Sequence, residues 1–494
     1  MITNFVAFLV ALTVAAVLTV VVRNRAVKYG WYDQAKSSRK VHVRPVPRLG
    51  GLAIVLAFGA PITALLFVDS GVGLIFRQQR DLILGLYAGG FAIAALGLYD
   101  DFHGAGARLK FGAQTGVALM LYVIGFRVET LSWPFGPPIA LGAFALPFTI
   151  LWMVGVINAM NLIDGLDGLA GGVAFFVVVT NFILAFSRSD ILVMLIMAAL
   201  GGAILGFLIF NFNPASIFMG DTGSMFLGFI LAAVAVKSST KSGTTVAMLV
   251  PIIALGLPIM DTFLAMGRRA LLGRSLFDAD KDHIHHRLMS RMRLTHRAAV
   301  FVLYGVCCLF AFAALGLAYA NGVQSAMLLV AVSVVVFVLI RKLGYLDMRE
   351  GKGATLIRRR NHELRNLVRE VARNVQASGN LSEVWNAVRP VAEEMAASRV
   401  ELRFQEATNG RKEGVLYESD RLEGTAFPVE VIIELRDGER RLGQLGVTWR
   451  DGRGNVNRDE ELALELVADA VSSVVTRMAL PAGPEGSKVL KLRR

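Results

Sequence analysis

The chain has 494 residues, of which 55% are hydrophobic and 18% charged, and its formal net charge is +13. Soluble domains carry about 25% charged residues, and the mean hydropathy here is +0.56. These values exclude a wholly soluble enzyme, a disordered chain and a nucleic-acid binder whose basic excess coats a soluble face. They predict a polytopic α-helical membrane protein with a soluble tail.

Apolar stretches long enough to cross a bilayer as a helix recur through the first 340 residues. We predict eleven such spans, at residues 4–22, 49–69, 82–99, 111–127, 143–160, 169–187, 191–210, 222–237, 244–267, 298–319 and 324–340. The loops 23–48 and 268–297 carry eight Lys or Arg residues each, and loops rich in these residues stay in the cytosol. We therefore expect the N-terminus outside and the C-terminus inside.

Two adjacent carboxylates, Asp100 and Asp101, end the third predicted span. The partial negative charge at a helix C-terminus disfavours both of them, so a purely structural role is unfavourable there. With Lys110 nearby, the pair suits a site that holds a cation or a proton donor. The alternative is a solvated helix end.

Four oxygen-bearing side chains follow at successive spacings of three, namely Asn158, Asn161, Asp164 and Asp167. If the segment stays helical, neighbours in this row face one another, although its four glycines also allow a broken helix. Amide and carboxylate oxygens suit Mg²⁺, which shares phosphate oxygens with its substrates. The alternative is a structural role, in which the small residues let two helices pack closely and the polar side chains form hydrogen bonds between them.

Asp221 stands where the eighth predicted span begins, in the sequence FMGDTGS. The backbone N–H groups at a helix start form an anion site, and a carboxylate beside an anion site is explained when a metal joins the two. The alternative is a carboxylate that merely favours the helix N-terminus. Phe218, just upstream, is equally suited to stacking on a base and to packing.

The last cluster lies in a basic loop and consists of three histidines followed by an arginine: His283, His285, His286 and Arg287. A second basic loop contains Arg48, in RPVPRLGG. Basic surroundings without a cysteine oppose a zinc site, so imidazole and guanidinium groups that converge on phosphate fit better. The alternative is a solvated loop.

Together these clusters predict a phosphoryl-transfer site at the cytosolic ends of the spans. Such a reaction needs a metal across a pyrophosphate and cations around the transferred group, and a lipid phosphate acceptor explains a location at the membrane. The rival class is a transporter or proton-coupled permease, which also uses intramembrane carboxylates. That class predicts charges near the midplane and an internal repeat, and neither is evident.

Five motifs occur in order within residues 1–340: RPVPRLGG, YDDFHGAGARLK, NAMNLIDGLDGLA, FMGDTGS and HIHHR. In these motifs the chain resembles the polyprenyl-phosphate N-acetylhexosamine-1-phosphate transferases, which include undecaprenyl-phosphate GlcNAc-1-phosphate transferases and the phospho-MurNAc-pentapeptide translocase. The HIHH form is more similar to the GlcNAc-1-phosphate branch. The resemblance implies eleven spans and a multi-pass protein of the bacterial inner membrane, with a cytosolic active site.

The resemblance also implies the reaction. A phosphotransferase that depends on Mg²⁺, or on Mn²⁺ in its place, would transfer N-acetylhexosamine-1-phosphate, most simply GlcNAc-1-phosphate, from a UDP-sugar. Undecaprenyl phosphate would be the acceptor and UMP would be released. The product would initiate a cell-surface polysaccharide, such as that of lipopolysaccharide.

The resemblance assigns roles motif by motif. Asn161 and Asp221 would hold the metal, and Asp100, with Asp101 beside it, would act as the catalytic carboxylate on the lipid phosphate. Asp164 and Asp167 are grouped with the catalytic carboxylates, because they would help to bind the nucleotide or position the site. The implied substrate-binding set is Arg48, Lys110 (on phosphate), Asn158, Phe218 (against uracil), His283, His285, His286 and Arg287.

The tail has a different charge pattern, with 27 basic and 24 acidic residues from Arg341 onward. We divide the chain into a transmembrane transferase domain (1–340), a juxtamembrane basic helix and linker (341–380), a cytosolic α+β accessory domain (381–480) and a flexible basic tail (481–494). Helices near 381–398 and 458–478 flank alternating segments at 400–406, 428–436 and 442–449, an order that resembles a GAF-like sensor domain. The sequence leaves open a homodimer and a protein or small-molecule partner for this domain.

Overall fold

The structure, a computed structural model, describes residues 1–31, 46–68, 71–131, 139–240, 248–271, 283–345, 363–364, 366–404, 416–420, 428–437, 440–451, 456 and 458–478. The chain divides into two compact units. The first comprises residues 1–268 and 277–347, and the second comprises residues 269–276 and 348–494. Each unit has a hydrophobic core of its own.

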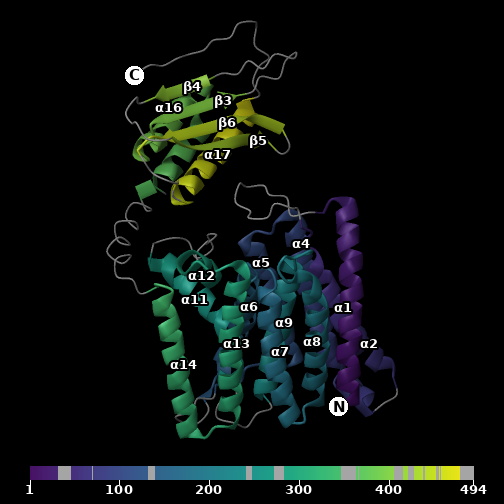
Figure 1. Ribbon diagram of the computed structural model, residues 1–494. Coiled ribbons are helices and arrows are strands. Elements are labelled where there is room, and N and C mark those ends of the chain that lie inside the picture. The colour runs from purple at the N-terminus through teal and green to yellow at the C-terminus, as the bar shows by residue number, and fades with distance from the viewer. Residues whose placement is uncertain are drawn as a thin grey trace. The chain divides into compact units, whose positions relative to one another are not determined.

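The first unit is almost entirely helical (Figure 1). Its helices are α1 (Ile2–Tyr29), α2 (Gly50–Phe67), α3 (Gly71–Gln78), α4 (Arg80–His103), α5 (Ala107–Ile124), α6 (Ala145–Leu162), α7 (Leu169–Ser187), α8 (Ile191–Asn211), α9 (Gly220–Thr240), α10 (Leu249–Ala254), α11 (Gly256–Leu271), α12 (Ile284–Met292), α13 (His296–Tyr319) and α14 (Gly322–Lys342). Between α5 and α6 lie two short paired strands, β1 (Thr130–Leu131) and β2 (Ile139–Ala140), and the 3₁₀ helix η1 (Gly142–Phe144).

Nine helices among the described residues are long and apolar enough to cross a membrane. They coincide with nine of the eleven predicted spans, so the prediction of a polytopic helical membrane protein is confirmed. The predicted span 111–127 corresponds to α5, which has a less apolar composition because Arg108 and Lys110 lie in its first turns.

The predicted span 244–267 is wrong as one continuous helix. Its described part consists of α10 and α11, and the chain turns between them at Leu255. Pro258 has no N–H to donate to the carbonyl of Ala254, so the regular bonding pattern fails at this point.

The helices α8 and α9 form the centre of the first unit. Within the most apolar 18 residues of each, 89% are buried, against 6% in α14. The backbone of α1 approaches α8 closely at Gly202 and Gly206, where a β-carbon would lie 2.2 Å from the Phe8 carbonyl oxygen and 2.3 Å from that of Leu12. Small residues permit such contacts between membrane helices, whose association depends on packing. This packed centre fixes the helix ends at which the polar motifs lie.

The second unit is a four-stranded antiparallel sheet with helices packed on one face (Figure 1). Its strands β3 (Arg399–Phe404), β4 (Leu416–Asp420), β5 (Val429–Asp437) and β6 (Arg440–Trp449) have the order β4-β3-β6-β5. The helices α16 (Leu381–Glu394) and α17 (Arg458–Met478) bury the face that carries Val431, Ile433 and Leu435. Among the described residues of this region, the predicted helices and strands are found, and β4, with a single aliphatic side chain, was not predicted.

Residues 366–377 are helical and match part of the predicted juxtamembrane helix. The remainder of that segment between 346 and 362, and the tail predicted to be flexible at 481–494, lie outside the described residues.

Candidate active site

Three of the polar motifs converge where α4 and α6 end and where α5 and α9 begin. The centre of this cluster is the side chain of Lys110, on the first turn of α5. Its Nζ lies 2.7 Å from Oδ2 of Asp221 and also contacts Oδ2 of Asp100. The Asp221 carboxylate also interacts with the side chains of Asn161 and Asp100. The structure therefore brings together the predicted metal ligands, the predicted catalytic carboxylate Asp100 and the predicted phosphate-binding lysine.

Asp101 is directed toward the start of α9. Its Oδ1 accepts the Asp221 N–H at 2.9 Å, and its Oδ2 accepts the N–H and the hydroxyl of Thr222 at 3.1 and 2.7 Å. The anion site expected at this helix start is thus filled by a carboxylate from α4. Both Asp101 oxygens are used in holding α9, which favours a positioning role over the catalytic role predicted for this residue.

The row of oxygen-bearing side chains spans a helix end. The helix α6 ends at Leu162, and a turn leads to α7 with Gly168 at a φ of +78°. Asn161, in the last turn of α6, donates to the Ser224 hydroxyl on α9 at 3.3 Å. Asn158, one turn earlier, is directed elsewhere and donates to Gln114 Oε1 on α5 at 2.6 Å.

The two aspartates of the turn have different surroundings. Oδ2 of Asp167 accepts hydrogen bonds from the Asn213 side chain at 2.8 Å and the Ala215 N–H at 3.1 Å, so Asp167 ties the turn to the loop after α8. Burial raises the pKa of the Asp164 carboxyl to about 7, and the negative charges of Asp221 and Asp101 add to this effect. Asp164 therefore belongs electrostatically to the cluster, whereas Asp167 braces it.

The first motif pairs with the segment before α9. Phe218 donates its N–H to the Pro47 carbonyl at 2.7 Å, and Gly50 donates to the Phe218 carbonyl at 2.9 Å. This pairing places Arg48, whose side chain is exposed, where its charge acts favourably on Asp164. Other basic residues of the loop 23–48, namely Arg39, Lys40, His42 and Arg44, lie outside the described residues.

The histidine motif forms the start of a helix, so the prediction of a loop there is wrong. His283 precedes α12, and its Nδ1 lies 2.9 Å from Oδ2 of Asp261, whose Oδ1 accepts the Ile284 N–H at 2.8 Å. His285 packs on Gly165 of the aspartate turn, where a β-carbon would lie 2.4 Å from its Nε2. Of the motif's four polar residues, His283, His285 and Arg287 are buried and His286 is exposed.

The charge state of His285 follows from this packing. Burial and the neighbouring imidazole of His286 lower the pKa of His285 to about 3, so this ring is neutral at physiological pH. Arg287 is directed away from the aspartate turn. It donates to the Leu343 carbonyl at 3.2 Å, and its guanidinium carbon lies 4.2 Å from the centre of the Tyr345 ring.

Asp261 is the residue that the sequence interpretation missed. It lies on α11, is 1% exposed, and anchors both His283 and the first turn of α12. The available signal was a lone acidic residue within the apolar stretch 244–267, because an ionisable group inside a membrane segment is costly unless it has a partner.

The oxygen donors at the cluster fit a hard cation. Asp221 interacts with both Asp100 and Asn161, so two carboxylates and an amide meet at this cluster, and these are the ligand types that Mg²⁺ prefers. Lys110 contacts the same carboxylates and would share them with the ion. In the described part of the chain, no group of three or more His, Cys, Asp or Glu side chains is placed to hold a metal ion.

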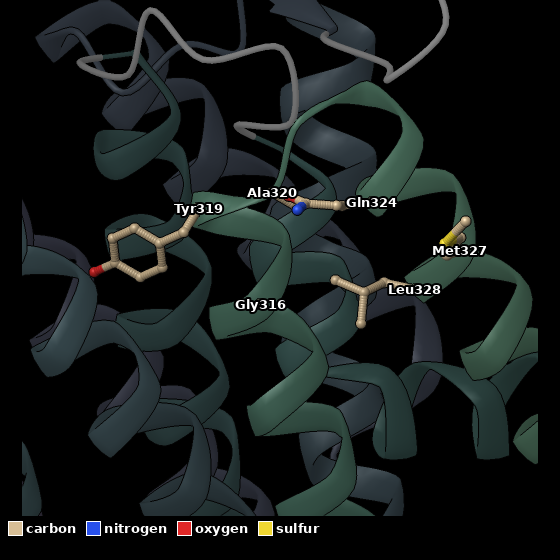
Figure 2. Close-up of a pocket in the computed structure, with 6 residues that line it drawn as sticks. All are labelled: Gly316, Tyr319, Ala320, Gln324, Met327 and Leu328. Carbon is tan, nitrogen blue, oxygen red and sulfur yellow. The ribbon is translucent and has the colours of Figure 1, made fainter.

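A separate hollow lies at the turn between α13 and α14, lined by Gly316, Tyr319, Ala320, Gln324, Met327 and Leu328 (Figure 2). Its lining is largely apolar and has no carboxylate, lysine, arginine or histidine. It therefore lacks the groups needed for phosphoryl transfer.

Comparison with known proteins follows the same motifs. Residues 83–239, which include the second to fourth motifs, match the model of glycosyl transferase family 4. Over 316 residues the chain is 41% identical to a probable undecaprenyl-phosphate N-acetylglucosaminyl 1-phosphate transferase of Bacillus subtilis, covering 64% of this chain and 85% of that protein. The chain belongs to glycosyl transferase family 4. The family predicted from the motifs is thereby confirmed.

Two further relatives of this family 4 chain have names that state different activities. A decaprenyl-phosphate N-acetylglucosaminephosphotransferase of Mycobacterium tuberculosis is 36% identical over 292 residues, or 54% of this chain and 70% of that protein. A phospho-N-acetylmuramoyl-pentapeptide-transferase of Streptococcus pyogenes is 35% identical over 200 residues, or 38% and 58% of the two chains. The alignments with N-acetylglucosamine-phosphate transferases are the longer ones.

Proposed function

We propose that this protein transfers GlcNAc-1-phosphate from UDP-GlcNAc to undecaprenyl phosphate. An oxygen of the lipid phosphate would replace the bridging oxygen at the β-phosphorus of the donor, and UMP would leave. The single observation that carries this proposal is the contact of Lys110 with both Asp100 and Asp221 at the end of several membrane helices. The names of the similar GlcNAc-phosphate transferases support the choice of sugar and lipid.

Within this proposal, Asp221 and Asn161 would hold Mg²⁺, with Asp100 beside them. The ion, when bound, would polarise the donor pyrophosphate and offset the charge that develops on it. Lys110 supplies a positive charge for phosphate, and Asp100 is the carboxylate nearest to it for the lipid phosphate. Asp101 keeps α9, and with it Asp221, in place.

The outer part of the site would bind the donor. Arg48 is exposed and its charge acts on Asp164, so it would contact a phosphate bound here. His285 is neutral, so it would donate or accept a hydrogen bond without adding charge. Phe218 is half-buried next to Arg48, where it would contact the uracil ring.

The membrane location extends the proposal. We propose eleven spans, with α5 and the α10–α11 pair added to the nine apolar helices, an external N-terminus and a site at the cytosolic face of a bacterial inner membrane. The eight basic residues in each of the loops 23–48 and 268–297 support this orientation. The product would then feed the assembly of a cell-surface polysaccharide.

The test is an assay of UMP release in membranes that contain the full chain. Undecaprenyl phosphate and Mg²⁺ are supplied with UDP-GlcNAc, UDP-GalNAc or UDP-glucose, and Asp100→Asn is compared with Asp81→Asn. Asp81 lies on the same helix as Asp100 but at its other end, with a side chain 84% exposed. We expect UMP release with UDP-GlcNAc. Asp100→Asn should abolish this release, and Asp81→Asn should preserve it. No release with any donor would refute the transferase.

A further inference from the structure

The helix α12 carries His285, which reaches the aspartate turn, and the helix is contacted from two sides. Its start is held by Asp261. His285 packs on Gly165 on one side of the helix, and Arg287 contacts Tyr345. Because an α-helix turns by about 100° per residue, two residues separated by two positions point about 200° apart. Tyr345 therefore lies behind α12 relative to the aspartate turn.

Tyr345 belongs to a short segment with a defined backbone, which we call the junction segment, Leu343–Tyr345. The Gly344 N–H donates to the Arg341 carbonyl at 3.0 Å, and the Tyr345 N–H donates to the Ile340 carbonyl at 3.1 Å. With Gly344 at a φ of +71°, these bonds form a Schellman motif that closes α14 and turns the chain.

The junction segment meets α12 through three separate contacts. The buried Leu343 accepts a hydrogen bond from Arg287 through its carbonyl oxygen. The Tyr345 ring lies 4.2 Å from the guanidinium carbon of Arg287, a cation–π contact. At Gly344 the backbone comes so close to the Arg291 guanidinium that a β-carbon would overlap it. The main part of the second unit begins three residues after Tyr345, at Met348.

We propose that Tyr345 is a positioning residue, which acts through Arg287 to hold α12 so that His285 stays seated on the aspartate turn. The inference rests on the proposed function only for its effect on the reaction. The seating of His285 is a property of the fold and can be measured without turnover.

The consequence for the reaction follows from where the histidines lie. The proposed function assigns His285 to the donor, whereas it assigns the lipid phosphate to Asp100 and Lys110. Loss of the Tyr345 ring should therefore weaken donor binding and leave acceptor binding unchanged. A residue that only stabilised the fold would lower the amount of active protein and so reduce the maximal rate, without changing the donor KM.

The test compares Tyr345→Ala with Tyr345→Phe, which keeps the aromatic ring. The control is Tyr319→Ala, which removes an exposed tyrosine at the C-terminal end of α13. All are made in the full chain. The first readout is modification of His285 by diethyl pyrocarbonate, located by tandem mass spectrometry. His285 is 2% exposed, and the exposed His103 serves as an internal reference.

For Tyr345→Ala we expect His285 labelling relative to His103 to rise by about fivefold, and the donor KM to rise by about five- to tenfold, a size that a lost cation–π contact explains. The acceptor KM should stay within about twofold, and Tyr345→Phe and Tyr319→Ala should resemble the wild type in both readouts. Unchanged labelling, or increased labelling with an unchanged donor KM, would overturn the inference. A third outcome is that Tyr345→Ala increases the labelling of His285 while the wild type itself releases no UMP. This outcome would refute the proposed function but would still establish that Tyr345 holds α12 in place.

Discussion

Lys110 and Asp221 form an ion pair of 2.7 Å although they lie 111 positions apart in the chain. The same ammonium contacts Asp100, so one lysine from α5 joins carboxylates from α4 and α9. This arrangement is possible because α4 packs against both α5 and α9. Groups in such direct contact do not respond independently to substitution.

Removal of the Lys110 charge tests this arrangement. In Lys110→Met the two carboxylates face each other without the ammonium, and a phosphate loses its positive partner. We expect UMP release to fall at least about a hundredfold, roughly 2.7 kcal/mol of barrier, while Lys110→Arg keeps the charge and part of the rate. Lys237→Met, in the last turn of α9, is the matched control. A rate for Lys110→Met above a tenth of the wild type would contradict the role.

Asp221 and Asn161 are the proposed metal ligands. Asp221→Asn and Asn161→Ala should each abolish turnover while the protein still inserts in the membrane, and added Mg²⁺ should restore little, because an ion that bridges a pyrophosphate tolerates the loss of neither ligand. Asp190→Asn is the control, since Asp190 caps the start of α8. Near-normal rates in both site variants would disprove the assignment.

Asp101 has a structural part in this cluster that a stability measurement detects. In Asp101→Leu the N–H groups of Asp221 and Thr222 and the Thr222 hydroxyl lose their acceptor, and each unsatisfied buried group costs about 1–3 kcal/mol. We expect a lower melting temperature of the purified protein together with loss of activity. Thr222→Val, which loses only the hydroxyl donor, should lie between this variant and the wild type. An unchanged melting temperature in Asp101→Leu would mean that Asp101 has no structural role and acts only in the reaction.

The raised pKa of Asp164 predicts a pH dependence of stability. Because this carboxyl keeps its proton up to about pH 7 in the folded chain but only to about pH 3.8 when exposed, the folded state binds more protons between these values. Stability without Mg²⁺ should therefore fall as pH rises through this window. Melting curves in EDTA at several pH values between 5 and 8 measure this, and Asp164→Asn should flatten the slope. The same slope in both proteins would exclude Asp164 as its source.

The tail is expected to be an accessory domain with a core of its own. A stop codon after Asp347, where the first unit ends, should leave UMP release within about tenfold of the wild type, roughly 1.4 kcal/mol of barrier. A stop after Leu343 also removes Tyr345 and should raise the donor KM further. A loss of more than about a hundredfold in a membrane-inserted, monodisperse protein ending at Asp347 would mean that the tail completes the site.

Much of the architecture could be predicted from local patterns. Among the described residues, nine apolar stretches are membrane-length helices, and the alternation at 428–436 and 442–449 corresponds to β5 and β6. Asp100, Lys110, Asn161 and Asp221 were selected by residue type and motif, and they lie together. These features can be predicted from the sequence because apolar periodicity and helix ends depend on residues that are close together in the chain.

The direction of each polar side chain was decided by the tertiary structure. Asp100 and Asp101 are adjacent, yet one contacts Lys110 and the other caps α9, 120 positions away. Asp261 and His283 meet through the fold of α11 and α12, and Arg287 is directed to Tyr345. The sequence alone determined which polar groups sit at helix ends, because that depends on local pattern. Only helix packing determined their partners, because each buried charge must be satisfied by whichever group the neighbouring helix presents.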